Sequence, residues 1–275
     1  MRQIITTIIA VIVLAATAYF ATEARHSAKS YEEISRVIVE KHNITELGSR
    51  RLKRLGDMLS LGFYKGYGEV LDEDKKLAET RYFFRERARR YTLYAMLTAL
   101  SLLPLYFAAT LRGFTAFVSL EALIMLAGGL TMPIMMMTIH KEVQYLGDVV
   151  LQMESKGVAG SITKLFDGGD YVVGGALFLF SILLPLLKTL SMLFVALFVR
   201  NRAAHTVVHF FKVLGKWSMA DVFVVAIFLV YLSGNRGEMS HAEVQVGIYF
   251  FLAYVILSML ASLSADRMLQ KERGA

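Results

Sequence analysis

The chain has 275 residues, of which 56% are hydrophobic and 19% are charged, and its formal net charge is +7. This composition excludes an ordinary soluble domain and predicts several membrane-spanning helices. The chain contains no cysteine, which excludes disulfides, thiolate metal sites and thiol chemistry.

Positive charge in a membrane protein bears first on topology and on anionic lipid head groups, so we predict a membrane partner and no nucleic-acid partner. The sequence has no Gly-Lys phosphate-binding loop, no Gly-x-Ser-x-Gly motif and no His-Glu-x-x-His motif. His205 and His209 have the i,i+4 spacing of metal ligands, but no third ligand lies near them in the sequence. We therefore predict no metal, no cofactor and no enzymatic activity.

An apolar run over residues 4–21 follows the single Arg2. Its length favours an uncleaved membrane anchor, and the small residues at 16–18 leave a cleaved signal peptide as the alternative. Residues 22–91 are polar, with apolar residues at helical spacing and a glycine-rich break at residues 62–68. This segment predicts an extracytoplasmic helical hairpin after the first span.

Five further apolar segments have the length of membrane spans. Together with the first run they predict an all-α fold, a polytopic membrane helix bundle with about six transmembrane helices. Glu121 lies near the start of the third span, where we expect it to favour the positive end of the helix dipole or to reach interfacial water, with a functional proton site as the alternative. The five segments are residues 92–111, 117–139, 171–199, 217–233 and 246–263.

A short amphipathic segment, residues 155–166, precedes the fourth span. Val158, Ile162, Leu165 and Phe166 share one face at helical spacing. We predict a helix in the plane of the membrane interface, with Ile162 and Phe166 among the residues that face lipid.

The fourth span contains Pro185 and Lys188. Lysine within a span is costly and usually faces a bundle interior or a wet cavity. Ser181, Lys188 and Ser191 fall on one helical face, and Pro185 cannot donate to the carbonyl four residues before it. We predict a helix kinked at Pro185 that presents a polar stripe. The alternative role for Lys188 is a static bridge between helices or a side chain that extends to the interface.

The fifth span opens with Trp217, Ser218 and Asp221. We predict Trp217 at the membrane interface, and Ser218 and Asp221 as partners of Lys188 in an intramembrane polar network. Ser218-x-x-Asp221 also matches a capping box, so helix capping is the alternative role for Asp221. A difference in depth of ~10 Å between Lys188 and Asp221 favours a water-bridged network over a direct salt bridge.

Orientation follows from the Lys and Arg residues of the short loops, which are enriched on the cytoplasmic side. With both termini cytoplasmic, the inner side holds nine of these residues and the outer short loops hold four. The arginines at 85, 87, 89 and 90 are outside this count and favour the opposite orientation. The inner residues are Arg2, Arg112, Arg200, Arg202, Lys212, Lys216, Arg267, Lys271 and Arg273, and the outer ones are Lys141, Lys156, Lys164 and Arg236.

Two motifs of the second half stand out, Ser181-x-x-x-Pro185-Leu-Leu-Lys188 and Gly215-Lys-Trp217-Ser218-Met-x-Asp221-Val222-Phe223. Through them, residues 116–267 resemble the membrane module of the paraquat-inducible protein A family. The resemblance implies a multi-pass protein of the bacterial inner (cytoplasmic) membrane. It also implies transport of phospholipid to or from a periplasmic partner that bears MCE domains.

The resemblance divides the chain into a four-span membrane module at residues 116–275 and an N-terminal two-span region at residues 1–115. Family members often have two modules and cysteine-based zinc ribbons, whereas this chain has one module and no cysteine. Metal binding is therefore not carried over from the family. The alternative function is a membrane sensor or scaffold whose outer hairpin binds a ligand or partner.

Overall fold

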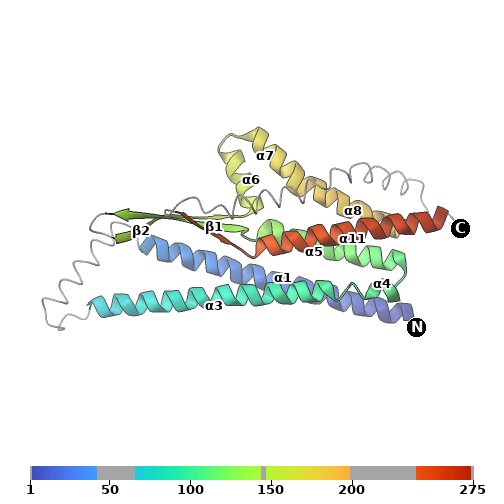
Figure 1. The fold of residues 1–275 in the computed structure, drawn as a ribbon, viewed down its shortest axis with the longest axis horizontal. Coiled ribbons are helices and arrows are strands. Elements are labelled where there is room, and N and C mark those ends of the chain that lie inside the picture. Colours follow the sequence, from blue (N-terminus) through green and yellow to red (C-terminus); the bar gives the residue numbers. More distant parts are fainter. Residues whose placement is uncertain (1, 42–65, 144–146, 199–239, 274–275) are drawn as a thin grey trace.

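The computed structural model describes residues 2–41, 66–143, 147–198 and 240–273, which form an elongated bundle of helices with a small sheet at one end (Figure 1). Within these ranges, five helical segments are long and apolar enough to cross a membrane: Gln3–Lys41, Asp72–Ala108, Leu111–Thr131, Tyr171–Leu197 and Gly247–Lys271. They correspond to the first, second, third, fourth and sixth predicted spans, which confirms a polytopic helix bundle. The predicted span at residues 217–233 lies outside the described residues.

The helices are named by their order along the chain. They are α1 (Arg2–Lys41), α3 (Gly66–Leu100), α4 (Leu105–Ala108), α5 (Leu111–Thr131), α6 (Val158–Asp167), α7 (Tyr171–Phe178), α8 (Leu184–Leu197) and α11 (Gly247–Arg273), with a π-helical turn η1 (Leu179–Leu183) between α7 and α8.

Helices α1 and α3 lie side by side along most of their length (Figure 1). Each continues without a break from an apolar half into a charged half, so the predicted hairpin is an extension of the two spans. Small side chains let the two backbones approach closely. Buried alanines of both helices belong to one core cluster, and Thr17 Oγ1 donates to Thr98 Oγ1 at 3.0 Å. Beyond the apolar halves, Arg87 pairs with Glu23 at 2.9 Å.

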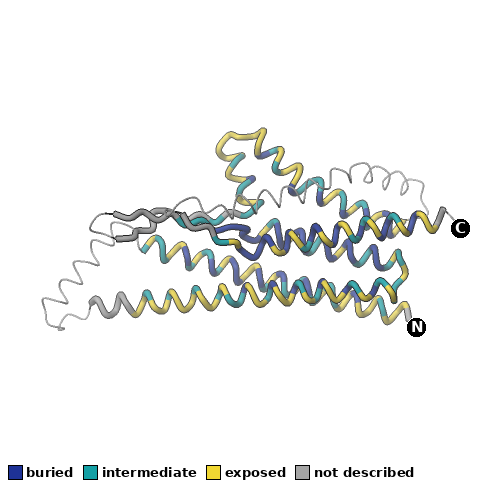
Figure 2. Tube along the Cα trace, in the orientation of Figure 1, coloured by how far each residue is buried: buried dark blue, intermediate teal, exposed yellow. Residues whose placement is uncertain are grey.

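Helices α5 and α11 form the buried centre of the bundle, as the dark segments in Figure 2 indicate. Gly128 and Gly129 permit this approach, because a Cβ atom at Gly129 would lie 2.9 Å from the backbone nitrogen of Phe251. Farther along the same helices, the hydroxyls of Thr115 and Ser264 share a 2.7 Å hydrogen bond.

The prediction that the third span continues to residue 139 is wrong. Helix α5 ends at Thr131, and Met132 has extended backbone angles (φ −91°, ψ 154°). Pro133 explains this end, because proline lacks a backbone donor and disfavours the helical conformation of the residue before it.

A three-stranded antiparallel sheet follows, in the order β2-β1-β3. Its strands are β1 (Met135–Val143), β2 (Gly147–Lys156) and β3 (Ser240–Val244). The sequence did not predict this sheet. The β3 strand leads directly into α11, and the Gly247 N–H donates to the Pro133 carbonyl at 2.9 Å. The sheet therefore ties the start of α11 to the end of α5.

Candidate functional site

The predicted fourth span is not one regular α-helix. Helix α7 passes through the π-helical turn into α8, and the Leu184 N–H donates to the Leu179 carbonyl, five residues earlier. A π turn is a local adjustment that membrane helices make at a proline. Pro185 lies in the first turn of α8, immediately after this irregular segment. The structure thus has a π turn immediately before Pro185, and the kink at Pro185 stays a prediction.

Two hydroxyls donate to the Pro185 carbonyl. Thr189 Oγ1 donates to it at 2.9 Å from within α8, and the Tyr254 hydroxyl donates at 3.1 Å from α11. Thr189 Oγ1 also lies 3.3 Å from the Tyr254 hydroxyl. Thr189 and Tyr254 are buried, so this contact is a polar link between two spans inside the bundle. The sequence prediction missed both residues, because a threonine and a tyrosine in apolar helices give no distinctive signal.

The predicted polar stripe has three members in the described part of the fourth span. Ser181 is buried in the π turn, whereas Lys188 and Ser191 are half-buried on α8. Ser191 Oγ donates to the Leu187 carbonyl at 2.6 Å, so its bond is local to the helix. Lys188 adjoins Thr189 in sequence and lies at the edge of the buried face of α8.

Trp217, Ser218 and Asp221 lie outside the described residues. The network of Lys188 with Ser218 and Asp221, and the interfacial position of Trp217, stay predictions.

Helix α6 forms where the sequence predicts the amphipathic segment, but one residue of its apolar face, Ile162, is buried. Ile162 is only 6% exposed, so it packs inside the protein and does not face lipid. A Cβ atom at Gly174 of α7 would contact Leu165 and Phe166, which shows how closely α6 approaches α7. Phe166 retains 36% exposure and is the better candidate for an interfacial contact.

The predicted position of Glu121 near the start of its span is also wrong. Because α5 begins at Leu111, Glu121 lies in mid-helix, and its exposure is 0%. The Thr17 side chain of α1 faces the carboxylate, but its one hydroxyl proton has two other acceptors at 3.0 Å, the Val13 carbonyl and Thr98 Oγ1. Neither carboxylate oxygen has a hydrogen-bond partner at ordinary distance among the described residues. Glu121 is thus a buried carboxyl group at the contact between α5 and the N-terminal helices, not an interfacial one.

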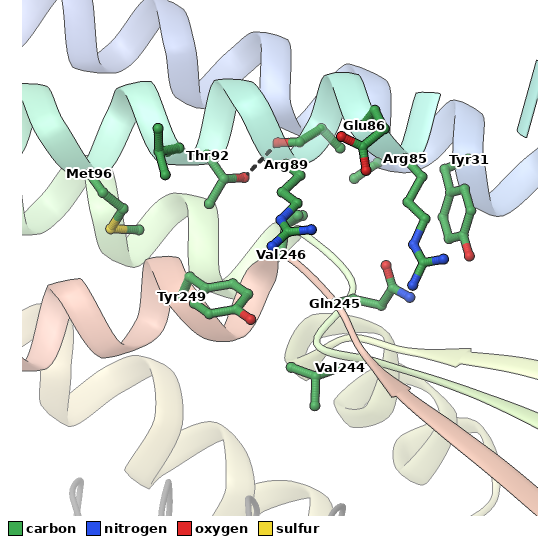
Figure 3. A pocket seen from close by; sticks show the side chains of 13 residues that line it. Tyr31, Arg85, Glu86, Arg89, Thr92, Met96, Val244, Gln245, Val246 and Tyr249 are labelled. Carbon is green, nitrogen blue, oxygen red and sulfur yellow. Dashed lines mark hydrogen bonds between the residues drawn. The ribbon is translucent and has the colours of Figure 1, made fainter. Parts of the chain in front are cut away.

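A pocket of about 550 Å³ opens between α1, α3 and the junction of β3 with α11 (Figure 3). Arg85 and Arg89 extend into it from α3, and Tyr31 lines it from α1 (Figure 3). Val246, just before α11, and Tyr249, in its first turn, also line the pocket. The residues of this pocket are far apart in sequence, so no local motif predicts it.

The charged groups of the pocket differ in their partners. Arg85 is 3.7 Å from the Glu243 carboxylate, which also accepts from the Tyr31 hydroxyl at 3.3 Å. Arg81 donates to the same hydroxyl at 3.1 Å, in an adjoining pocket of about 430 Å³. Arg89 forms no ion pair or hydrogen bond with any described residue, and neither does the Glu86 carboxylate. The pocket therefore contains one cation and one anion that form no ion pair with another described residue, and Arg89 is exposed.

Within the described ranges, no three His, Cys, Asp or Glu side chains are grouped so that they could hold a metal ion.

Comparison with known proteins identifies relatives of the second half of the chain. The model of the family described as paraquat-inducible protein A matches residues 111–272. A protein of Haemophilus influenzae named "Probable intermembrane transport protein" is 31% identical over 111 residues, which cover 38% of this chain and 26% of that protein. The Escherichia coli K12 protein named "Intermembrane transport protein PqiA" is 27% identical over 128 residues, which cover 44% of this chain and 30% of that protein. No solved structure matches.

The alignments therefore span between about a quarter and a third of the length of these curated relatives. The family match begins with α5 and excludes α1, α3 and α4.

Proposed function

The chain belongs to the paraquat-inducible protein A family, and on this basis we propose that it is an inner-membrane subunit of a phospholipid transport system. In this proposal it exchanges phospholipid with a periplasmic partner that bears MCE domains, between the inner and outer membranes. The observation that carries the proposal is the family match over residues 111–272. Relatives named as intermembrane transport proteins support it.

Two features of the fourth span, a lysine and a π turn, favour a role in transport over a role as a membrane anchor alone. A lysine and a π turn in one span are costly features for a helix that only has to hold the protein in lipid. In the proposal, Lys188 is the charge that responds to lipid or proton movement, with Ser218 and Asp221 as its partners. Ser181 and Ser191 line the same helix and extend its polar stripe.

The proposed orientation has both termini in the cytoplasm. The charged halves of α1 and α3, the sheet and α6 then lie on the periplasmic side, where an MCE-domain protein is accessible. Figure 1 supports this arrangement for the sheet and the charged halves of α1 and α3, which lie toward the end of the bundle opposite the start of α1.

The partner distinguishes the proposal from a sensor or scaffold. We would crosslink the full chain in its native membrane, purify it and identify its partners. Recovery of an MCE-domain protein is the expected result. Recovery of a signalling protein in its place, with no MCE-domain protein, would contradict the transport function and favour a sensor.

A further inference from the structure

We propose that the pocket between α3 and the start of α11 binds a zwitterionic phospholipid head group, with its phosphate on Arg89 and its ammonium at Glu86. The inference rests on the proposed function for its ligand class, which is phospholipid. The site itself lies largely in the N-terminal helices, which the family match does not cover.

The position of the pocket is the first argument. Along α3 its lining changes from the charged residues Arg85, Glu86 and Arg89 to Leu93 and Met96. Eleven residues separate Arg85 from Met96, a distance of ~16 Å along the helix axis. The pocket thus spans the boundary between the charged and apolar halves of α3, where the polar and apolar parts of a bilayer lipid also meet.

The unsatisfied charges are the second argument. Arg81 and Arg85 already interact with Tyr31 and Glu243, whereas Arg89 has no partner among the described residues. Figure 3 shows the Arg89 side chain extended into the pocket. A guanidinium binds phosphate with two parallel N–H donors, and Arg85 is one helical turn away to supply further donors.

Glu86 determines which head group fits. Glu86 lines the same pocket, and its carboxylate has no partner among the described residues. A carboxylate beside a phosphate is unfavourable unless the ligand brings a cation. A phosphoethanolamine group does so, because it has an ammonium two carbons beyond the phosphate. Glu86 and Arg89 are three residues apart on one helix, so they are neighbours on its surface.

The size and openness of the pocket fit a head group with its chains outside. About 550 Å³ is within the range of small-molecule sites. Leu93 and Tyr249, which line its apolar part, are more than half exposed. Acyl chains of a bound lipid would therefore leave the pocket past these side chains and remain in the bilayer.

Lipid binding by the purified full chain tests the proposal. Native mass spectrometry would measure binding of phosphatidylethanolamine and phosphatidylglycerol, with phosphoethanolamine and inorganic phosphate as competitors without acyl chains. We expect the wild type to prefer phosphatidylethanolamine. We expect Arg89→Gln to weaken binding of both lipids about tenfold or more, since it removes charge-assisted hydrogen bonds. Glu86→Gln should abolish the preference while retaining phosphatidylglycerol binding.

Arg90→Gln is the matched control, because Arg90 is an exposed neighbour on α3 that does not line the pocket. Equal binding by Arg89→Gln and Arg90→Gln would overturn the proposal. Displacement of the lipid by inorganic phosphate at equal concentration would also overturn it and indicate a free-phosphate site. Arg89→Lys, which keeps the charge without the planar fork, should bind between the wild type and Arg89→Gln.

The binding result and the proposed function can fail separately. Unaltered lipid binding by Arg89→Gln, in cells that transport phospholipid normally, overturns the pocket assignment alone. Loss of binding in Arg89→Gln, with phospholipid distribution unaffected by deletion of the whole chain, overturns the transport function alone.

Discussion

The Tyr254 hydroxyl of α11 donates a 3.1 Å hydrogen bond to the Pro185 carbonyl of α8. The acceptor lies in the first turn of α8, directly after the π turn, where regular helical hydrogen bonding is interrupted. Inside a bilayer a buried hydroxyl without a partner is costly, so this bond satisfies the Tyr254 hydroxyl and links α11 to α8 beside the irregular segment. The bond also fixes the position of α8 along the axis of α11.

Tyr254→Phe removes the hydroxyl while preserving the ring. We expect it to lower the stability of the detergent-solubilised protein by about 1 kcal/mol, in line with single hydrogen bonds between membrane helices. Tyr249→Phe is the control, because Tyr249 is on the same helix and 52% exposed. Equal thermal stability of the two variants would show that the Tyr254 bond does not hold α8.

The approach of α5 to α11 depends on Gly129. A Cβ atom there would lie 2.9 Å from the backbone nitrogen of Phe251, and backbone atoms cannot move aside as a side-chain tip can. We therefore expect Gly129→Ala to destabilise the bundle by roughly 1–3 kcal/mol, the usual range for overpacking. At Gly175 of α7 no atom lies within 4 Å of the added Cβ. Gly175→Ala should leave thermal unfolding unchanged, and an equal loss in both variants would contradict this packing.

The third prediction concerns Glu121. An ionised carboxylate is stable inside a protein only with donors or a cation beside it, and the described residues provide no hydrogen bond to either oxygen. A glutamine side chain at this position would be neutral and of nearly the same shape. We expect Glu121→Gln to unfold at the same temperature as the wild type or higher. A marked loss of thermal stability would mean that the folded protein holds Glu121 through an ionic contact.

Membrane topology is the fourth prediction. In a chain with no natural cysteine, single cysteines can be placed at Gly66, Gly168 and Gly274. With both termini cytoplasmic, an impermeant thiol reagent added to cells with a permeabilised outer membrane should label the first two positions only. Labelling at position 274 and not at position 66 would reverse the proposed orientation.

The sequence predicted features whose signal is local. Apolar segments of sufficient length predicted the five spans that the described residues contain. Pro133 was visible as well, but the apolar methionines after it favoured a continued helix. These methionines belong to β1 and pair with β3, about a hundred positions later in the chain, and no local pattern encodes such a contact.

Among the residues of the candidate site, too, only those with a local signal in the sequence could be predicted. Lys188 was noticeable because a charge in an apolar helix is rare, whereas Thr189 and Tyr254 are ordinary in such a helix. The apolar run alone predicts a span that begins at residue 117 and so puts Glu121 near the interface, whereas α5 begins six residues earlier, at Leu111. The surroundings of Arg89 come from β3 and α11, more than 150 residues later.

In the proposed function this chain transports phospholipid between membranes and Lys188 takes part. The direct measurement is the distribution of pulse-labelled phospholipid between inner and outer membranes, in cells without the chain and in cells complemented with wild type or Lys188→Met. Methionine keeps the apolar stem and removes the charge. We predict that deletion shifts the distribution, that the wild type restores it, and that Lys188→Met, made at normal level, does not. An unchanged distribution after deletion would contradict transport, and full restoration by Lys188→Met would leave Lys188 as a structural charge.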